Sequence, residues 1–190
     1  MDHIESAKLA IRDQLLTARG RQPVAELAAR AQARAALLLA APEVRRAATV
    51  AAYVSVGREP GTGPLLDGLL SLGKRVILPL LQPDNDLDWA VHDGRLVSAS
   101  RGLLEPDGRP LGFDAIATAD VVIVPGLAVD PTGMRMGRGG GSYDRALGRV
   151  PVGTFTCVLL NSEEVLPQVP RDSHDRHVSA AATELDLLRF

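Results

Sequence analysis

A glycine-rich segment at residues 125–147 contains the residue types that could bind a phosphate group. Its sequence is PGLAVDPTGMRMGRGGGSYDRAL, in which Arg135 and Arg138 lie among glycines. Five glycines surround them: Gly133, Gly137, Gly139, Gly140 and Gly141. Glycine has no Cβ, so backbone N–H groups can turn toward an anion and approach it closely. Because guanidinium groups also suit phosphate oxygens, the pattern predicts a phosphate-binding loop.

The position of this loop in the chain supports that prediction. It follows the apolar run Asp120–Val124, which is typical of a buried strand, and it leads into a predicted helix at Ser142–Leu147. Ligands of open α/β sheets bind at the carboxyl ends of strands, and the positive end of a helix attracts anions. The alternative is a flexible surface loop, which is the commoner explanation of an isolated glycine cluster.

The loop matches neither of the common nucleotide-binding fingerprints. A GxGxxG pattern started at Gly137 has Ser142 at its last position, and the pair Gly73-Lys74 is followed by Arg75 rather than by Ser or Thr. The sequence therefore indicates neither a dinucleotide-binding fold of the usual kind nor a Walker A loop.

Two aspartates are candidate ligands of Mg²⁺, which is commonly held by one or two carboxylates together with phosphate oxygens. Asp144 directly follows the glycines, and its alternative role is to cap the helix or to interact with the helix dipole. Asp175, in PRDSHDRHV, is the preferred second ligand, although Asp172 would serve equally on composition alone. His174 and His177 have no Cys or His cluster beside them, so we expect structural or surface roles.

Helices at the start of the chain position two further cations. Residues 2–41 are rich in Ala, Leu, Arg and Gln and predict two helices, with Pro23 in the first turn of the second. Lys8 and Arg12 lie one turn apart on the same face of the first helix. Exposed charges on a helix are usually just solvated, but two like charges at this spacing repel mildly, and a bound anion would relieve that repulsion.

A strand, a helix and a second strand follow, which predicts a parallel pair of strands. They lie at Thr49–Val56, Pro64–Leu72 and Arg75–Leu80. The next prediction is a β-hairpin formed by Leu87–His92 and Arg95–Ala99, because the intervening Asp-Gly pair at 93–94 favours a tight turn.

Apolar runs at Val152–Leu160 and Val178–Ala182 complete the core. The predicted fold class is α/β, a three-layer α/β/α arrangement with an open, mainly parallel sheet and an added β-hairpin. At 190 residues we expect a single domain, residues 1–190, with the helical segment 1–41 packed on its core. Cys157 is expected in the core, and so is Trp89, for which the alternative is a lid over a substrate.

Composition excludes several classes of protein. The chain is 46% hydrophobic and 23% charged, as in ordinary globular domains. Its net charge of −2 disfavours nucleic acid and anionic membranes as partners. The lone Cys157 cannot form an internal disulfide, and the first residues lack the features of a secretory signal, so we expect a cytoplasmic protein. The apolar run Ala35–Ala41 is too short to span a bilayer.

Taken together, these motifs resemble the signature of the 5-formyltetrahydrofolate cyclo-ligase family, also called methenyltetrahydrofolate synthetases. The glycine-rich segment is similar to the family's PGLAFD followed by G-x-R-[LM]-G-x-G-x-G-x-YD. Further elements match in the family's order: K-x-x-x-R as Lys8 and Arg12, the folate-contacting glutamate as Glu59, G-x-x-EP as Gly102, Glu105 and Pro106, and HD as His174 and Asp175. The resemblance covers nearly the full chain.

The resemblance implies an enzyme that cyclises 5-formyltetrahydrofolate to 5,10-methenyltetrahydrofolate and releases ADP and phosphate. The formyl oxygen would take the γ-phosphoryl group of ATP, and the neighbouring folate nitrogen would then attack the same carbon. The resemblance thus implies ATP as co-substrate, Mg²⁺ as cofactor and a reduced folate as substrate, and we expect a monomer.

The family's site residues carry over to matching positions. Arg138 would act catalytically, near the transferring phosphoryl group, and Asp144 and Asp175 would bind Mg²⁺. The implied ATP-binding set is Lys8, Arg12, Arg135, Met136, Gly137, Arg138, Gly139, Gly140, Gly141, Ser142 and Tyr143. The implied folate-binding set is Val54, Glu59, Gly139, Gly141 and Ser142.

The chain departs from the family pattern at three positions. Ser142 stands where the family often has Tyr, Val129 where it usually has Phe, and Ser179 where it tends to have an acidic residue. Two alternatives follow. One is a catalytically weak or inactive nucleotide- or folate-binding module of the same fold, and the other is a kinase or ligase that acts on a different small-molecule acceptor.

Overall fold

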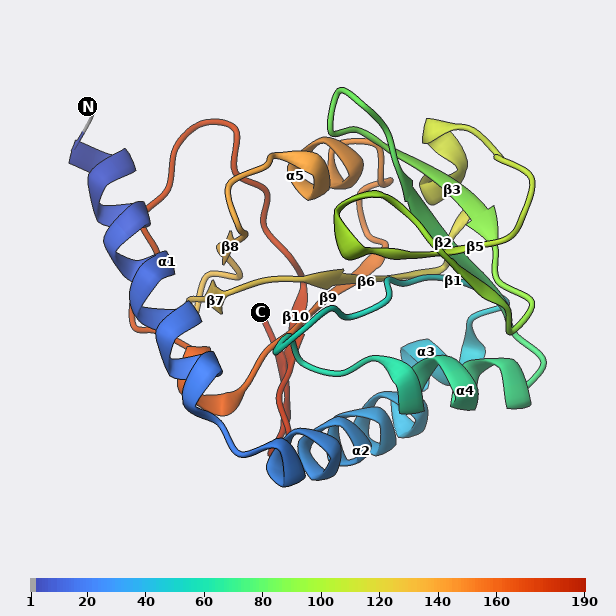
Figure 1. The fold of residues 1–190 in the computed structure, drawn as a ribbon, viewed down its shortest axis with the longest axis horizontal. Helices are drawn as coiled ribbons and strands as arrows, with labels where there is room; N and C mark the ends of the chain where they lie inside the picture. The colour runs from blue at the N-terminus through green and yellow to red at the C-terminus, as the bar shows by residue number, and fades with distance from the viewer. Residues whose placement is uncertain (1–2) are drawn as a thin grey trace.

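The computed structural model describes residues 3–190, and a seven-stranded sheet lies at its centre (Figure 1). The spatial order of the strands is β11-β10-β9-β6-β1-β2-β3. Their bounds are β1 Thr49–Ala51, β2 Arg75–Leu81, β3 Leu87–Val91, β6 Val121–Pro125, β9 Phe155–Leu159, β10 Ala180–Ala182 and β11 Leu187–Arg189. The five inner strands pair in parallel, while β3 and β11 add antiparallel edges. This arrangement confirms the predicted mainly parallel α/β sheet.

Helices cover both faces of the sheet and give the molecule three layers (Figure 1). One face packs against α2 (Val24–Ala40), α3 (Pro42–Arg46) and α4 (Gly63–Ser71). The other packs against the short α5 (Ser142–Leu147) and the 3₁₀ segment Phe113–Thr118. The Ala- and Leu-rich sequence of α2 favours a long helix. It contacts β10, whose three buried alanines let helix and sheet pack closely.

The predicted parallel pair is confirmed, but its first strand is shorter than predicted. β1 pairs with β2, with Thr49 opposite Arg75, and α4 forms the crossover. The strand ends at Ala51 rather than at Val56, because residues 53–56 leave the sheet after the Ala52 N–H donates to the Ile77 carbonyl at 3.0 Å. The apolar sequence continues past Ala51, but the hydrogen-bonded pairing of β1 with its neighbours does not.

The predicted hairpin between Leu87–His92 and Arg95–Ala99 is wrong. β3 pairs with β2 instead, across a turn in which Asn85 has a φ of 64°, and this pairing fully buries Trp89. The second half of the predicted hairpin, β4 (Leu96–Ser98), pairs with β5 (Leu104–Pro106) in a separate two-stranded sheet. Another small sheet joins β7 (Ala128–Val129) to β8 (Arg135–Met136). Hairpins therefore decorate the core, at places other than the one predicted.

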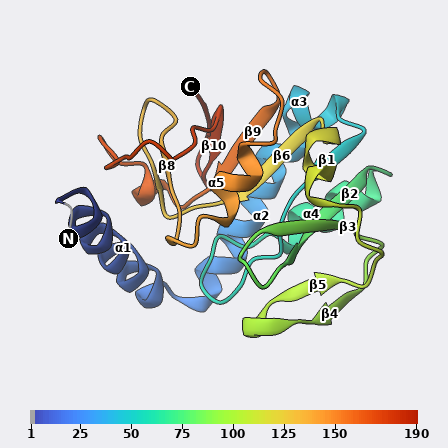
Figure 2. The same cartoon turned by 90° about the horizontal axis from the view of Figure 1, so that it is seen from above.

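The two predicted N-terminal helices are present as α1 (His3–Arg21) and α2, with Pro23 at the N-cap of α2 rather than in its first turn. Residues 1 and 2 of the predicted segment 1–41 lie outside the described residues. Figures 1 and 2 both show α1 at one side of the molecule, apart from the helices that cover the sheet.

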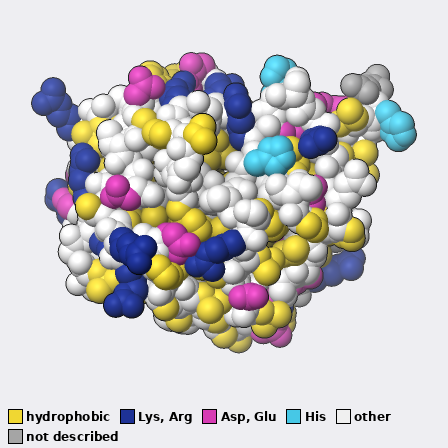
Figure 3. Space-filling view, turned by 180° about the vertical axis from the view of Figure 1, so that it is seen from behind, with side chains coloured by type: hydrophobic (Ala, Val, Ile, Leu, Met, Phe, Trp, Pro, Cys, Tyr) yellow, Lys and Arg dark blue, Asp and Glu magenta, His cyan; other side chains and the backbone are white. Residues whose placement is uncertain are grey.

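Trp89 and Cys157 are both fully buried in the core, as expected. Burial raises the pKa of the Cys157 thiol to about 12. Within residues 3–190, the helices are too short or too polar for any of them to cross a membrane. On the face shown in Figure 3, acidic and basic side chains are interspersed.

Candidate functional site

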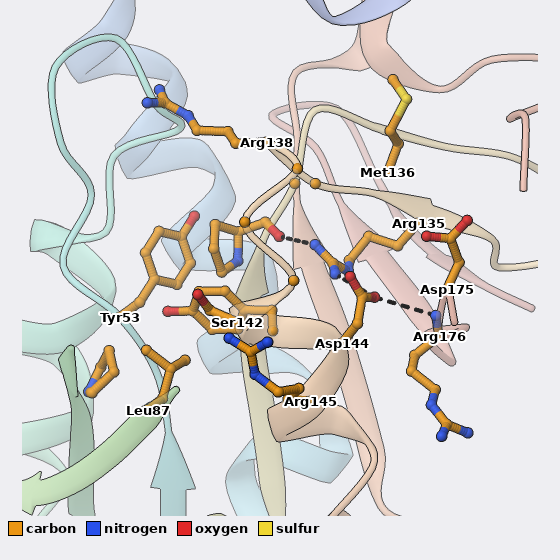
Figure 4. A pocket seen from close by; sticks show the side chains of 18 of the residues that line it. Tyr53, Leu87, Arg135, Met136, Arg138, Ser142, Asp144, Arg145, Asp175 and Arg176 are labelled. Carbon is orange, nitrogen blue, oxygen red and sulfur yellow. Dashed lines mark hydrogen bonds and ion pairs between the residues drawn. The ribbon is translucent and has the colours of Figure 1, made fainter. Parts of the chain in front are cut away.

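A cavity of about 830 Å³ lies where the segments after β1 and β6 meet α1, α5 and residues 172–176. β1 has β2 on one side and β6 on the other, so the chain order reverses between β1 and β6. Such a switch point leaves a crevice beyond the carboxyl ends of the two strands, where α/β proteins bind ligands. The structure brings every site residue predicted from the sequence to the lining of this one cavity. Figure 4 labels some of them, among them Arg135, Arg138 and Asp144.

The two cations of α1 reach the cavity with different partners. The Lys8 ammonium is buried and donates to Asp175 at 2.5 Å and to Asp172 at 3.0 Å. Burial lowers the pKa of Lys8, but the two carboxylates outweigh it and raise the pKa above its ordinary value. Arg12 donates from Nε to the Gly137 carbonyl at 3.1 Å, which ties α1 to the glycine-rich loop.

Arg135 and Asp144 form the framework of that loop. The Arg135 side chain is buried and donates to the Pro125 carbonyl at 3.0 Å and to Asp144 Oδ1 at 2.9 Å. A Cβ at Gly137 would come within 2.9 Å of the Arg135 guanidinium, so a larger residue there would have to displace this hydrogen-bonded group. Gly141, with a φ of 71°, turns the chain into α5, which a larger residue would do only under strain.

Arg138 and Glu59 lie next to each other in the lining of the cavity. The Arg138 side chain is 53% exposed, and its Nε lies 3.4 Å from Glu59 Oε1. Glu59 is held in place because its other oxygen accepts the Val56 N–H at 2.9 Å. The predicted catalytic arginine and the predicted folate-binding glutamate thus form an ion pair in this structure.

The carboxylates of Asp144 and Asp175 lie in the same corner of the cavity. Asp144 Oδ1 accepts the backbone N–H of Arg176, the residue after Asp175, at 3.2 Å. The two side chains supply hard oxygen donors, which fit Mg²⁺ if phosphate oxygens complete its coordination. Residues 3–190 contain no cluster of three or more His, Cys, Asp or Glu side chains that could hold a metal without a ligand's help.

Two tyrosines form an aromatic wall that sequence reasoning predicted only in part. The rings of Tyr53 and Tyr143 meet edge to face with their centroids 6.4 Å apart. Burial raises the pKa of both phenols. Tyr143 belongs to the recognised motif, whereas Tyr53 was missed because residues 49–56 were all assigned to a strand. Its position next to Val54 was the available signal.

Other lining residues come from segments whose pairing was predicted incorrectly or not at all. Leu87 begins β3, and Leu104 lies on β5, which pairs with β4 in a separate sheet. Arg145 and Arg149 line the cavity from the end of α5 and just beyond it. Asp172, left open as an alternative to Asp175, also lines the cavity.

The departures from the family pattern fall in different places. Ser142 lines the cavity, whereas Val129 is fully buried in the core. Ser179 is not among the lining residues, and its hydroxyl donates to the Thr156 carbonyl and accepts the Thr156 N–H. His174 lines the cavity, and His177 forms an isolated β-bridge with Met134.

Comparisons with known proteins agree with one another. The sequence model described as the 5-formyltetrahydrofolate cyclo-ligase family matches residues 4–184. A protein of Mycolicibacterium smegmatis named 5-formyltetrahydrofolate cyclo-ligase is 44% identical over 133 residues, 67% of this chain and 69% of its own length. A mouse protein of the same name is 27% identical over 198 residues, 95% of each chain.

Two solved structures share the fold. The 5,10-methenyltetrahydrofolate synthetase of Aquifex aeolicus superposes with a TM-score of 0.82 at 28% identity, covering 96% of this chain and 92% of its own. The 5,10-methenyltetrahydrofolate synthetase of Mycoplasma pneumoniae superposes with a TM-score of 0.75 at 17% identity, covering 93% and 98%, a likeness of fold alone.

Proposed function

The chain belongs to the 5-formyltetrahydrofolate cyclo-ligase family, and from this premise we propose that it uses ATP to cyclise 5-formyltetrahydrofolate to 5,10-methenyltetrahydrofolate. The observation that carries the proposal is the convergence of all the predicted site residues on one cavity at the switch point of the sheet.

In the proposed reaction the formyl oxygen attacks the γ-phosphorus of ATP, and ADP leaves with the electrons of the broken P–O bond. The second folate nitrogen then attacks the formyl carbon and loses its proton, and phosphate leaves with the former formyl oxygen. Such phosphoryl transfer needs little covalent help from a protein, so positioning and charge neutralisation supply most of the catalysis.

The cationic side of the cavity is the proposed ATP site. Lys8, Arg12 and the loop from Arg135 to Tyr143 would bind the nucleotide, with Arg138 beside the transferring phosphoryl group. Arg138 suits that role because its guanidinium is half exposed and held by one ion pair, whereas Arg135 is buried and fixed by the loop. Asp144 and Asp175 would hold Mg²⁺, which when bound neutralises phosphate charge.

The part of the cavity around Glu59 is the proposed folate site, which shares Gly139, Gly141 and Ser142 with the proposed ATP site. Glu59 would accept hydrogen bonds from the pterin, and Val54, Gly139, Gly141 and Ser142 would line the same site. The Tyr53 and Tyr143 rings offer apolar surface next to Glu59, as the flat pterin requires. The segment 1–41 would serve the site through Lys8 and Arg12, and we propose a monomeric, cytoplasmic enzyme.

The test is an absorbance assay of the purified protein with 5-formyltetrahydrofolate, ATP and Mg²⁺, in which each component is omitted in turn. We expect methenyltetrahydrofolate only when all three are present. MgATP binding without product would favour the inactive binding module, and ATP hydrolysis that the folate does not stimulate would favour a different acceptor.

A further inference from the structure

A buried ion pair at the far end of α1 has no role in the reaction described above. Arg19 is 2% exposed, as is Glu164, although the two residues lie 145 positions apart in the sequence. Arg19 Nε donates to Glu164 Oε1 at 2.6 Å, and Nη2 donates to Glu164 Oε2 at 2.8 Å. Burial lowers the pKa of Arg19, but the bidentate carboxylate outweighs it and raises the pKa.

The same guanidinium also binds the chain that enters the phosphate loop. Arg19 Nη2 donates to the Gly126 carbonyl at 2.6 Å, and Gly126 lines the cavity directly after β6. Glu164 is fixed in turn, because it accepts the Asn161 N–H at 2.9 Å. Arg19 thus connects α1 to the first residues of the loop and to a rigid turn after β9.

Besides the Arg19 contacts, α1 is attached by the hydrogen bonds of Lys8 and Arg12 and by a small apolar cluster. Its buried residues are Lys8, Leu15 and Arg19, so two of the three docking positions are cations. These residues and Arg12 recur at spacings of 3 and 4 and therefore share one face. Leu15 packs with Leu127 and Met136 in a small cluster, and the partly buried Ile11 of α1 packs against the same cluster.

We infer that Arg19 and Glu164 are positioning residues that set the register of α1 against the phosphate loop, so that Lys8 and Arg12 reach the nucleotide. The inference rests on the proposed ATP site. Each residue of an α-helix adds about 1.5 Å along its axis, so slippage by one residue would displace both cations by that distance. A misplacement of about 1 Å at a catalytic site can reduce a rate by about 100-fold.

The experiment compares R19M/E164Q with the parent protein. Removing both charges avoids leaving a lone buried ion, which would strongly destabilise the fold. The amide oxygen that E164Q introduces can still accept the Asn161 N–H. The matched control is R189M/E43Q, which removes another bidentate pair, with N–O distances of 2.9 and 3.0 Å, outside the cavity lining.

Two readouts distinguish positioning from a merely structural role. By calorimetry we expect the Kd for MgATP to rise at least 10-fold in R19M/E164Q, with the Kd for 5-formyltetrahydrofolate changed less than twofold. By hydrogen exchange we expect faster exchange in residues 3–21 and unchanged exchange in β6 and β9. In R19K the charge is kept but the planar fork is lost, so we expect an intermediate Kd for MgATP.

A Kd for MgATP within twofold of the parent in R19M/E164Q would overturn the inference, and so would an equal loss of affinity for both substrates. A parent protein that binds MgATP but forms no methenyltetrahydrofolate would overturn the proposed function and leave this comparison intact. A parent that binds no MgATP would overturn both.

Discussion

The two arginines of the phosphate loop have different tasks that the sequence does not distinguish. Arg135 is 3% exposed and bonds the Pro125 carbonyl and Asp144, so it maintains the shape of the loop. Arg138 is half exposed and contacts only the Glu59 carboxylate among the described ion pairs. The exposed Arg138 guanidinium is therefore the one that we propose contacts the transferred phosphoryl group.

Arg138→Ala tests this assignment. We expect kcat to fall at least about 100-fold, the usual effect of losing one preorganised donor to a transition state, while the melting temperature stays unchanged. Arg95→Ala is the matched control, because the Arg95 side chain is 73% exposed and lies outside the cavity lining. Parental turnover in Arg138→Ala would refute the catalytic role.

Tyr53 offers a stability prediction at the same scale. Its hydroxyl is buried and has no hydrogen-bond partner among the described residues. An unsatisfied buried hydroxyl is unfavourable, so Tyr53→Phe is expected to raise the free energy of unfolding by about 1 kcal/mol. Urea unfolding measures the change, and a decrease would show that the hydroxyl has a partner in solution.

At the scale of elements, the sequence predicted the existence of strands better than their partners. The runs that became β2, β6, β9 and β10 were recognised because buried parallel strands are continuously apolar. The Asp-Gly pair at 93–94 is a strong local turn signal, but it does not decide whether the flanking strands pair with each other. In the structure β3 pairs with β2 instead, and this pairing buries the large apolar side chain of Trp89.

The same distinction explains which parts of the site were predicted. The glycine-rich loop is contiguous, so its residue types could be assigned from the sequence and from the family pattern. The contacts of Lys8 with Asp172 and Asp175 span more than 160 positions, and no local pattern encodes them. Tyr53 was not predicted for a different reason. The strand β1 ends at Ala51, so the segment that contains Tyr53 is not part of the sheet.

Arg149 links three elements near the cavity, and its partner gives a pH-dependent prediction. Arg149 donates to both oxygens of Asp86 at 2.8 and 2.6 Å, joining the β2–β3 turn to the end of α5, and its guanidinium lies over the Phe113 ring. The hydrogen bonds to Arg149 lower the pKa of Asp86 below its ordinary value of 3.8.

Asp86→Asn is therefore expected to destabilise the protein most at pH 5–7, where the carboxylate is ionised in both the folded and the unfolded chain. A group whose pKa is lower in the folded state stabilises above its unfolded pKa, so the difference should shrink as the pH falls below about 4. Urea unfolding from pH 3 to pH 7 measures it, with the exposed Asp67→Asn as control. A difference that does not vary with pH would contradict the pairing.

At the scale of the whole molecule, an ion pair connects the two proposed substrate sites in the absence of ligands. Arg138 of the proposed ATP site pairs with Glu59 of the proposed folate site, so under that proposal each substrate would have to separate this pair to contact its own residue. The free energy needed to separate the ion pair reduces the affinity for the first ligand to bind, but not for the second. Binding of the two substrates is therefore expected to be cooperative.

Calorimetry with a non-hydrolysable ATP analogue tests this cooperativity. We expect 5-formyltetrahydrofolate to lower the Kd of the analogue at least about fivefold, the lower end of common coupling energies. In Glu59→Gln the pair is absent, so the ratio of the two Kd values should fall toward one, even though folate binding itself weakens. A ratio that is the same in both proteins would exclude the pair as the source of coupling.

The unequal covering of the sheet has a consequence for local unfolding. One face is covered by the 17 residues of α2 together with α3 and α4, while α5 on the other face has only six residues. Tyr143 and Asp144 lie on that short helix and line the cavity, so the cavity is on the face of the sheet that has the shorter helix. A bound substrate would fill this side of the molecule, and the protein would be most resistant to proteases while its substrates are bound.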